Sequence, residues 1–401
     1  MKNAPTRKLH PDTLAIHTSV AKSQYGENSD ALYLTSGYVQ PDAATAARRF
    51  AGEEEGYTYS RLGNPTVTSM EKRLAAMEGT EACIGTSTGM SAILLMCMGL
   101  LKAGDHVICS HSMFGSTIKL IGSEFAKFGV QSSFVSQTNA AEWQAAVRPS
   151  TKLLFAETPT NPLTDVCDIR ALADIAHNAG ALLAVDNCFC TPALQRPIEF
   201  GADIIAHSGT KYLDGQGRVM AGALCGTRQL MDEVMMPVMR SAGMTLSPFN
   251  AWVVHKGMET LGVRMEAQSR RALELAQWLQ DQPQVAQVFY PGLTSHPQHE
   301  LAMAQQSGMG GAVLSFAVKA TDNDARERAS CVMDALQVIE RCTNLGDVKS
   351  LVSHPASTSH GRLSEAQRHT AGIVQGMVRL AVGLEHVGDL KADLQFALET
   401  L

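Results

Sequence analysis

The chain has 401 residues, of which 45% are hydrophobic, and carries a formal net charge of −6. That length and apolar content allow a large buried core spread over two or three domains, and the acidic balance argues against general binding to nucleic acid or acidic membranes. Nine cysteines without Cys-x-x-Cys spacing, and a polar N-terminus without an apolar signal segment, favour reduced thiols in the cytoplasm. The thirteen histidines show no metal-ligand spacing, and the longest apolar run, at 93–101, is too short to span a bilayer, so we expect neither a metal site nor membrane insertion.

Residues 1 to about 60 lack a sustained hydrophobic period, so we expect an extended arm there rather than a domain. Just after it, Tyr59 and Arg61 lie two residues apart, and side chains with that spacing point the same way on an extended chain. A phenol and a guanidinium placed together can bind one phosphate. Incidental polar residues on a surface arm are the alternative.

A glycine-containing segment, Gly85–Ala92, precedes an apolar, helix-like run. Its glycines would let backbone N–H groups at a helix N-terminus approach an anion closely, as they do in phosphate sites. A plain helix start capped by Thr or Ser fits the pattern equally well.

From about residue 71 to residue 226, short apolar strands alternate with helical segments. We predict a helix at 169–178 and strands at 106–110, 152–157, 182–186, 203–208 and 219–225. The alternation predicts an α/β fold with a mostly parallel central sheet covered on both faces. Ligands of such sheets bind at the carboxyl ends of the strands.

Two of these strands lead into residues that suit a pyridoxal 5′-phosphate (PLP) site. Asp186 ends one strand, and Lys211 follows the next in the segment 208–211. A lysine that forms a Schiff base needs surroundings that favour loss of its proton, and a pyridinium needs a buried anion. Each feature alone is commonly a turn or a helix cap, but the two together predict PLP.

Asn161 follows the strand at 152–157, in the same row of strand ends as Asp186. An amide at that place could donate to the phenolic oxygen of PLP, although Asn-Pro more often starts a turn.

The chain beyond about residue 250 predicts a smaller α/β domain. A long helical stretch runs from about 250 to 280, followed by short strands at 311–317 and 378–382 and helices at 322–336 and near the C-terminus. The last strand contains Arg379, and a buried arginine there would bind either a substrate carboxylate or a structural ion-pair partner.

Several segments, in order, resemble motifs of the Cys/Met-metabolism family of PLP-dependent enzymes, which includes cystathionine synthases and lyases, methionine γ-lyase and homoserine-ester sulfhydrylases. They cover nearly the whole chain: Tyr-Ser-Arg-x-Gly-Asn-Pro-Thr at 59–66, Gly-Met at 89–90, Glu-Thr-Pro-Thr-Asn-Pro at 157–162, Val-Asp-Asn at 185–187, Ser-Gly-Thr-Lys at 208–211, Ser-His-Pro-Ala at 353–356 and Val-Arg-Leu at 378–380. The resemblance implies the type I aminotransferase-like fold and a homotetramer built from two active dimers. We expect an N-terminal arm at 1–60 that contacts a neighbouring subunit, a large PLP-binding domain at 61–250 and a C-terminal domain at 251–401.

The resemblance also assigns roles around the cofactor. Lys211 would form the Schiff base and act as the catalytic amine, with Tyr59 as a second catalytic group, and Asp186 would pair with the pyridinium nitrogen. The groups that would hold the phosphate are those of Gly89, Met90, Ser208 and Thr210, with Tyr59 and Arg61 reaching in from the neighbouring subunit.

Four further roles concern the ring and the substrate. Asn161 would face the ring hydroxyl, and Phe114 would stack on the ring at a position where many members of the family have Tyr. Arg379 would bind the substrate α-carboxylate with help from the backbone of Ser350.

The same comparison narrows the activity. Ser116 stands where methionine γ-lyases carry a cysteine, which counts against that activity. Together with Phe114, the segments 208–218 and 358–363 look most like the O-succinylhomoserine sulfhydrylase branch of the family.

We therefore expect a PLP-dependent γ-replacement in methionine biosynthesis, in which sulfide displaces succinate from O-succinyl-L-homoserine and gives L-homocysteine. Cysteine in place of sulfide, as in cystathionine γ-synthase, and O-acetylhomoserine as the ester are the alternatives. A PLP-fold protein without catalysis would be expected to lack Lys211 or Asp186. Four arginines are equal candidates to bind the distal carboxylate of the succinyl group: Arg48, Arg49, Arg218 and Arg362.

Overall fold

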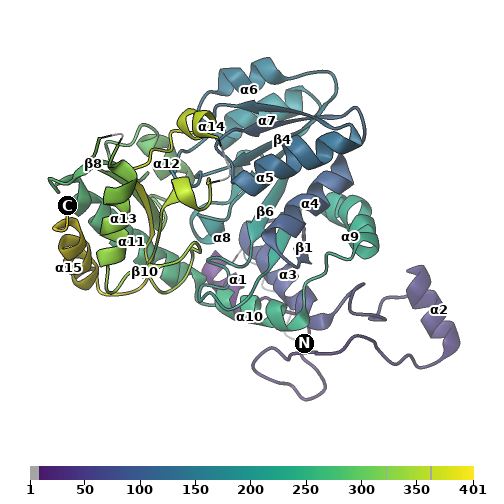
Figure 1. The fold of residues 1–401 in the computed structure, drawn as a ribbon. Coiled ribbons are helices and arrows are strands. Elements are labelled where there is room, and N and C mark those ends of the chain that lie inside the picture. The colour runs from purple at the N-terminus through teal and green to yellow at the C-terminus, as the bar shows by residue number, and fades with distance from the viewer. Residues whose placement is uncertain (1–8, 322, 362–363) are drawn as a thin grey trace.

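The computed structural model describes residues 9–321, 323–361 and 364–401. Two β-sheets organise this part of the chain, one in its N-terminal and one in its C-terminal portion (Figure 1). None of the helices in these ranges is long and apolar enough to cross a membrane.

The larger sheet has seven strands in the order β1-β7-β6-β5-β4-β2-β3. Strands β2 to β6 pair in parallel, and β7 runs antiparallel to both of its neighbours, so the prediction of a mostly parallel sheet is confirmed. The bounds are β1 (Ala82–Thr86), β2 (His106–Ser110), β3 (Gln131–Val135), β4 (Thr151–Glu157), β5 (Leu182–Asp186), β6 (Ile204–Ser208) and β7 (Gly222–Gly226).

Four of the five strands predicted in this region agree with the structure to within one residue, and the fifth begins later. Strand β7 starts at Gly222 instead of residue 219, because the backbone of Ala221 is tied to the Thr210 hydroxyl, which accepts from its N–H at 3.0 Å. The sequence pattern did not predict the edge strands β1 and β3.

Helices cover both faces of the large sheet, which explains why its strands are apolar runs without alternation. On one face, α4 packs on β6 and β7, with α5 and α9 beside it; on the other, α3 packs on β1 and α6 and α7 cover the strands toward β3. The bounds are α3 (Pro65–Glu78), α4 (Gly89–Leu100), α5 (Gly115–Lys119), α6 (Ala140–Ala146), α7 (Ile169–Asn178), α8 (Thr191–Leu194) and α9 (Met236–Ala242).

The smaller sheet has the order β10-β11-β12-β9-β8, and its core lies against the helices α11, α13 and α15. Its strands are β8 (Val285–Phe289), β9 (Val313–Val318), β10 (Glu340–Arg341), β11 (Leu351–Ser353) and β12 (Met377–Ala381). The helices of this part are α10 (Pro248–Met258), α11 (Leu261–Gln280), α12 (His299–Gln305), α13 (Ala325–Ala335), α14 (Glu365–Thr370) and α15 (Val387–Leu398).

The helical stretch predicted from about 250 to 280 is divided into α10 and α11. Glu259 and Thr260 donate to carbonyls three residues back rather than four, which interrupts the α-helical ladder between them. The helix predicted at 322–336 is α13, and residue 322 lies outside the described ranges.

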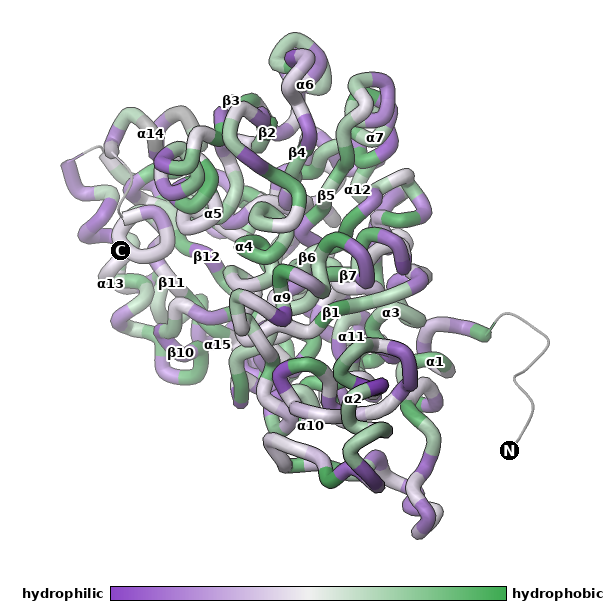
Figure 2. The backbone as a smooth tube through the Cα atoms, turned by 90° about the vertical axis from the view of Figure 1, so that its right-hand side faces the viewer, coloured by the Kyte–Doolittle hydropathy of each residue, from purple (hydrophilic) through white to green (hydrophobic). Residues whose placement is uncertain are grey.

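The N-terminal arm carries two short helices that the sequence pattern did not predict, α1 (Pro11–His17) and α2 (Ala43–Ala51). Capping explains α2, because the Asp42 carboxylate accepts from the N–H of Thr45 at 2.7 Å and Gly52 ends the helix with φ of 78°. Figure 1 shows α2 standing away from the body of the chain, and Figure 2 shows hydrophobic as well as hydrophilic residues along it.

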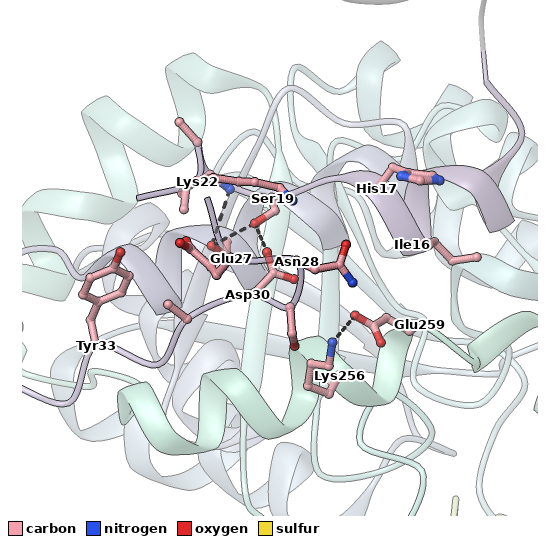
Figure 3. Close-up of a pocket in the computed structure, with 15 residues that line it drawn as sticks. Ile16, His17, Ser19, Lys22, Glu27, Asn28, Asp30, Tyr33, Lys256 and Glu259 are labelled. Carbon is pink, nitrogen blue, oxygen red and sulfur yellow. Dashed lines mark hydrogen bonds and ion pairs between the residues drawn. The ribbon is translucent and has the colours of Figure 1, made fainter. Parts of the chain in front are cut away.

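The base of the arm is anchored on α3 and α10 by a charged cluster. The buried guanidinium of Arg73 donates to the backbone carbonyl of Thr18 at 3.0 Å and lies 3.4 Å from Asp30, whose carboxylate also meets His255 at 2.8 Å. Figure 3 shows the cavity of about 530 Å³ beside this cluster, with the Lys256–Glu259 ion pair of 2.5 Å at its rim. These contacts fix where the arm leaves the body.

Candidate active site

The predicted site residues meet at the carboxyl ends of the parallel strands. Glu157 ends β4, Asp186 ends β5, and the two are direct neighbours in the pairing register. Lys211 follows β6 in a tight turn whose N–H groups bond back to Ser208 and Ala221. Parallel strands end at one edge of the sheet, so this edge collects the lysine and two carboxyl groups.

Lys211 lies in surroundings that favour its neutral amine. Burial lowers the pKa of Lys211, the neighbouring Cys188 thiol opposes the shift, and the Arg379 cation adds to it. Its Nζ donates to the side-chain oxygen of Asn344, which comes from the loop between β10 and β11. A half-buried amine with a lowered pKa is suited to bond to a carbonyl carbon and to move protons.

Asp186 is half-buried beside the lysine turn. Burial raises the pKa of Asp186 to about 6, opposed by the backbone N–H of Cys188, which donates to its Oδ1 at 3.0 Å, and by the charge of His207. A cation placed against this carboxyl would favour its charged form.

The glycine-containing segment forms a capped helix start, and its backbone stays accessible enough for the phosphate interpretation to remain a prediction. The Thr88 hydroxyl caps α4 by accepting from the N–H of Ser91 at 3.0 Å. A Cβ on Gly89 would lie only 2.9 Å from the Cβ of Ser208, so glycine is needed for this close approach of α4 to β6. The start of α4, Ser208 and the Thr210 turn thus form a cradle suited to a phosphate.

Met90 and Phe114 lie on the same side of the sheet as this cradle. The Met90 sulfur accepts from the Thr117 hydroxyl at 3.9 Å, which joins α4 to α5. Phe114 is half-buried, and its backbone N–H donates to Glu157 at 2.8 Å. Phe114 is therefore positioned by the carboxyl group of Glu157, which we did not predict as part of the site.

Arg379 is buried in β12, with 2% of its surface exposed. Its Nη1 donates to Asn161 at 3.1 Å, and its Nη2 donates to the carbonyls of Thr343 at 3.2 Å and Asn344 at 2.9 Å. Its Nε has no hydrogen-bond partner, and burial lowers the pKa of Arg379 to about 10. A buried cation held by neutral oxygens, with its Nε hydrogen and one Nη1 hydrogen left over, can donate to an anion such as a carboxylate.

Ser350, which we predicted to assist Arg379 through its backbone, is bonded to Glu385. It is fully buried, its N–H donates to Glu385 at 2.6 Å and its hydroxyl donates to the same carboxylate at 2.8 Å. The backbone donor is therefore already used, and the residue that joins Arg379 to Lys211 is Asn344. Asn344 belongs to no motif and lies in a loop, so its position follows only from the folded chain.

Tyr59 and Arg61 lie together but away from Lys211. The Arg61 guanidinium is 5.5 Å from the centre of the Tyr59 ring, and it donates to the backbone carbonyl of Arg240. Within the described ranges, no hydrogen bond or ring contact joins either residue to Lys211 or Asp186.

Three of the four candidate partners for a distal carboxylate lie in the described ranges, and each of them pairs with an acidic side chain. Arg48 and Arg49 both pair with Glu54 on the arm, at 2.8 and 3.1 Å. Arg218 pairs with Asp214 at 2.7 Å, and Arg362 lies outside the described residues.

PLP fits the groups gathered here. The phosphate cradle has no room for a Cβ at Gly89, and burial of Lys211 favours its neutral amine. Asp186 offers a carboxylate at the end of β5, the strand next to the one that leads to Lys211. The unpartnered Nε of Arg379 leaves a donor for the substrate beside the lysine. The fold and the site therefore define a PLP-dependent enzyme of the type I aminotransferase-like fold.

The chain belongs to the Cys/Met metabolism PLP-dependent enzymes, whose family model matches residues 12–399. It is 53% identical to an O-succinylhomoserine sulfhydrylase of Pseudomonas aeruginosa over 97% of this chain and 95% of that protein, and 41% identical to an L-methionine gamma-lyase of Porphyromonas gingivalis over 97% of each. A solved structure from Campylobacter jejuni that carries N′-pyridoxyl-lysine-5′-monophosphate matches with a TM-score of 0.93 at 32% identity, over 98% of this chain and all of that one.

Proposed function

We propose that this PLP-dependent enzyme makes L-homocysteine and succinate from O-succinyl-L-homoserine and sulfide. The observation that carries the proposal is the bridge made by Asn344, whose side chain binds the Lys211 amine while its backbone carbonyl binds Arg379. An amino acid whose carboxylate rests on Arg379 would have its α-carbon next to that amine. The similarity to O-succinylhomoserine sulfhydrylases, 53% and 42% identical, supports the choice of ester and nucleophile.

The chain's own residues account for binding and proton movement. PLP, when bound, supplies an electron sink for the α-carbon of the substrate. Arg379 orients the α-carboxylate, and the neutral Lys211 amine takes the proton from Cα and returns it later. Loss of a proton from Cβ lets the C–O bond at Cγ break with its electron pair on succinate, hydrosulfide then bonds to Cγ, and protons return to Cβ and Cα.

Phe114 supports sulfide as the nucleophile. Its ring can stack but cannot exchange a proton, so proton transfer falls to Lys211, with Tyr59 as a second donor if it enters from a neighbouring subunit. The half-buried phenyl ring makes the site more apolar than a phenol would, which suits a small nucleophile such as hydrosulfide.

A homotetramer of two active dimers agrees with the exposed arm. Several large apolar side chains are exposed there, at Tyr25 (85%), Leu34 (70%), Val39 (100%) and Phe50 (67%). A patch of that kind favours a protein partner, and a second copy of the chain could bring Tyr59 and Arg61 to its phosphate cradle, with which they share no hydrogen bond inside the described part of one chain. We assign these residues to the neighbouring site.

The remaining assignments follow the same interpretation. We divide the chain into an arm at 1–60, a PLP-binding domain at 61–250 and a C-terminal domain at 251–401, since the large sheet ends at residue 226 and the small sheet begins at residue 285.

We place the enzyme in the cytoplasm because all nine cysteines lie in the described ranges as free thiols.

Replacement of the lysine tests the proposal. Lys211→Ala should lose the visible absorbance of the lysine-bound cofactor and homocysteine synthesis while keeping its fold by circular dichroism. Lys349→Ala is the matched control, because Lys349 is an exposed lysine paired with Glu340 at 3.2 Å on the surface. Normal turnover in Lys211→Ala would contradict the assignment.

A further inference from the structure

Strands β4 and β5 place two carboxyl groups side by side at the cofactor edge of the sheet. Glu157 and Asp186 are partners in the register, so their side chains leave the sheet on the same face. Glu157 is 5% exposed and Asp186 is half-buried. Like charges this close in a buried place are not both ionised without a cost of several kcal/mol per ion.

The groups around this pair are mostly neutral donors. The backbone N–H groups of Phe114 and Asn161 bond to Glu157, the first at 2.8 Å, and the N–H of Cys188 bonds to Asp186. Within the described ranges neither carboxyl forms an ion pair with a lysine or arginine. The charged or titratable groups that act on the pair are His207 on β6, whose Nε2 is bound to the buried Glu78 carboxylate at 2.6 Å, and the Cys188 thiol after β5, with Lys211 acting on that thiol.

The two carboxyls are not equivalent. Glu157 is the more deeply buried of the two: burial, followed by the Asp186 charge, raises the pKa of Glu157 to about 8, opposed by the backbone N–H groups of Phe114 and Asn161. Burial also raises the pKa of Asp186, to about 6, opposed by the backbone N–H of Cys188 and the charge of His207. Coupled groups of this kind titrate as one unit, and desolvation favours a shared proton on the more deeply buried Glu157.

We propose that Glu157 holds the shared proton of this pair and is a positioning residue, leaving a single negative charge on Asp186 to face the ring nitrogen of the cofactor. This inference deepens the proposed function and rests on it. One negative charge matches one pyridinium, whereas an ionised Glu157 would place a second anion against the same ring. Glu157 also accepts from the backbone N–H of Phe114, so the same group sets both the charge beside Asp186 and the position of the aromatic side chain that would meet the cofactor.

Infrared difference spectroscopy of the holoenzyme tests the proton directly, independent of turnover. The wild type should show a carboxylic-acid C=O band that disappears as the pH rises between about 7 and 9, near the pKa of about 8 of Glu157. Glu157→Gln should lack this band. Glu71→Gln is the matched control, because Glu71 also accepts a backbone N–H, from Gly85 at 2.8 Å, and burial raises its pKa to about 7, but it lies on α3 away from Asp186.

Asp186→Asn provides a second measurement with Glu157 intact. Removing the Asp186 charge should lower the pH at which the Glu157 band disappears. The burial of Glu157 stays the same in this variant, so the change in pH reports the neighbouring charge. Two outcomes would overturn the inference. One is a carboxylic-acid band of the wild type that is unchanged in Glu157→Gln, or no such band at all; the other is a Glu157 band that disappears at the same pH in Asp186→Asn as in the wild type. Those results are distinguishable from failure of the proposed function, since an enzyme that preferred cysteine or another ester would still show the band.

Discussion

Replacing Arg379 with lysine tests how the substrate carboxylate is bound. Arg379 uses Nη1 and Nη2 to hold Asn161, Thr343 and Asn344, and its unpartnered Nε and the second Nη1 hydrogen are the donors left for a ligand. Lysine keeps the positive charge but loses this fork. Loss of one charge-assisted hydrogen bond costs about 1.5–3 kcal/mol, which is about a ten- to 150-fold fall in kcat/KM. Because the contact is made in the bound ground state as well, most of the fall should appear as a higher KM.

The pH dependence of Arg379→Lys gives a second, sharper signature. Burial lowers the pKa of Arg379 from 12.5 to about 10. The same desolvation acting on a lysine, whose ordinary pKa is about 10.4, would lower its pKa as well. Either cation binds a carboxylate only while protonated, so binding is lost as pH rises through the pKa in the folded protein. The kcat/KM of Arg379→Lys should therefore decline at a lower pH than that of the wild type.

Steady-state kinetics with O-succinylhomoserine and sulfide over a range of pH would measure both effects. Arg264→Lys is the control: Arg264 is also buried with a pKa lowered to about 10, but it donates to the carbonyls of Tyr212 at 2.9 Å and Gly257 at 2.8 Å. That variant should lose thermal stability without moving the pH limb of kcat/KM. Unchanged KM and an unchanged pH profile in Arg379→Lys would refute the assignment of the carboxylate site.

The other predictions concern the neighbouring subunit and the aromatic side chain. Arg61→Ala should retain PLP weakly, and mixing it with inactive Lys211→Ala should restore activity, because hybrid dimers contain one intact site; no recovery despite demonstrated subunit exchange would place Arg61 in its own chain's site. Phe114→Tyr should keep the ring contact, worth about 0.5–1.5 kcal/mol, but reduce the preference for sulfide over cysteine in competition assays. An unchanged preference would make Phe114 a neutral packing choice.

The sequence predicted those parts of the site that depend on strand ends. Asp186 and Lys211 follow apolar strands in a parallel sheet, and parallel strands bring their carboxyl ends to one edge, so their meeting could be predicted without a structure. Arg379 was identified because a single cation in an apolar strand needs an anion or neutral acceptors.

The residues that were missed depend on long-range contacts. The contacts of Ser350 were not predicted, because its donors bind Glu385, 35 residues away, and its role beside the substrate carboxylate stays a prediction. Asn344 has no motif, and its contacts with Lys211 and Arg379 arise only from packing of the two sheets. Glu157 lies beside Asp186 because of the register between β4 and β5. The local hydrophobic period of the sequence does not determine that register, so the role of Glu157 was not predicted.

The central claim is that this site replaces succinate with sulfide at Cγ of O-succinyl-L-homoserine. The most direct measurement is kcat/KM for homocysteine formation from sulfide and for cystathionine formation from cysteine, at equal nucleophile concentrations, with O-succinyl- and O-acetyl-L-homoserine each as the ester. We predict that O-succinyl-L-homoserine with sulfide gives the highest value of the four combinations. A higher value with cysteine would make the enzyme a cystathionine γ-synthase, and a higher value with the acetyl ester would contradict the assigned substrate.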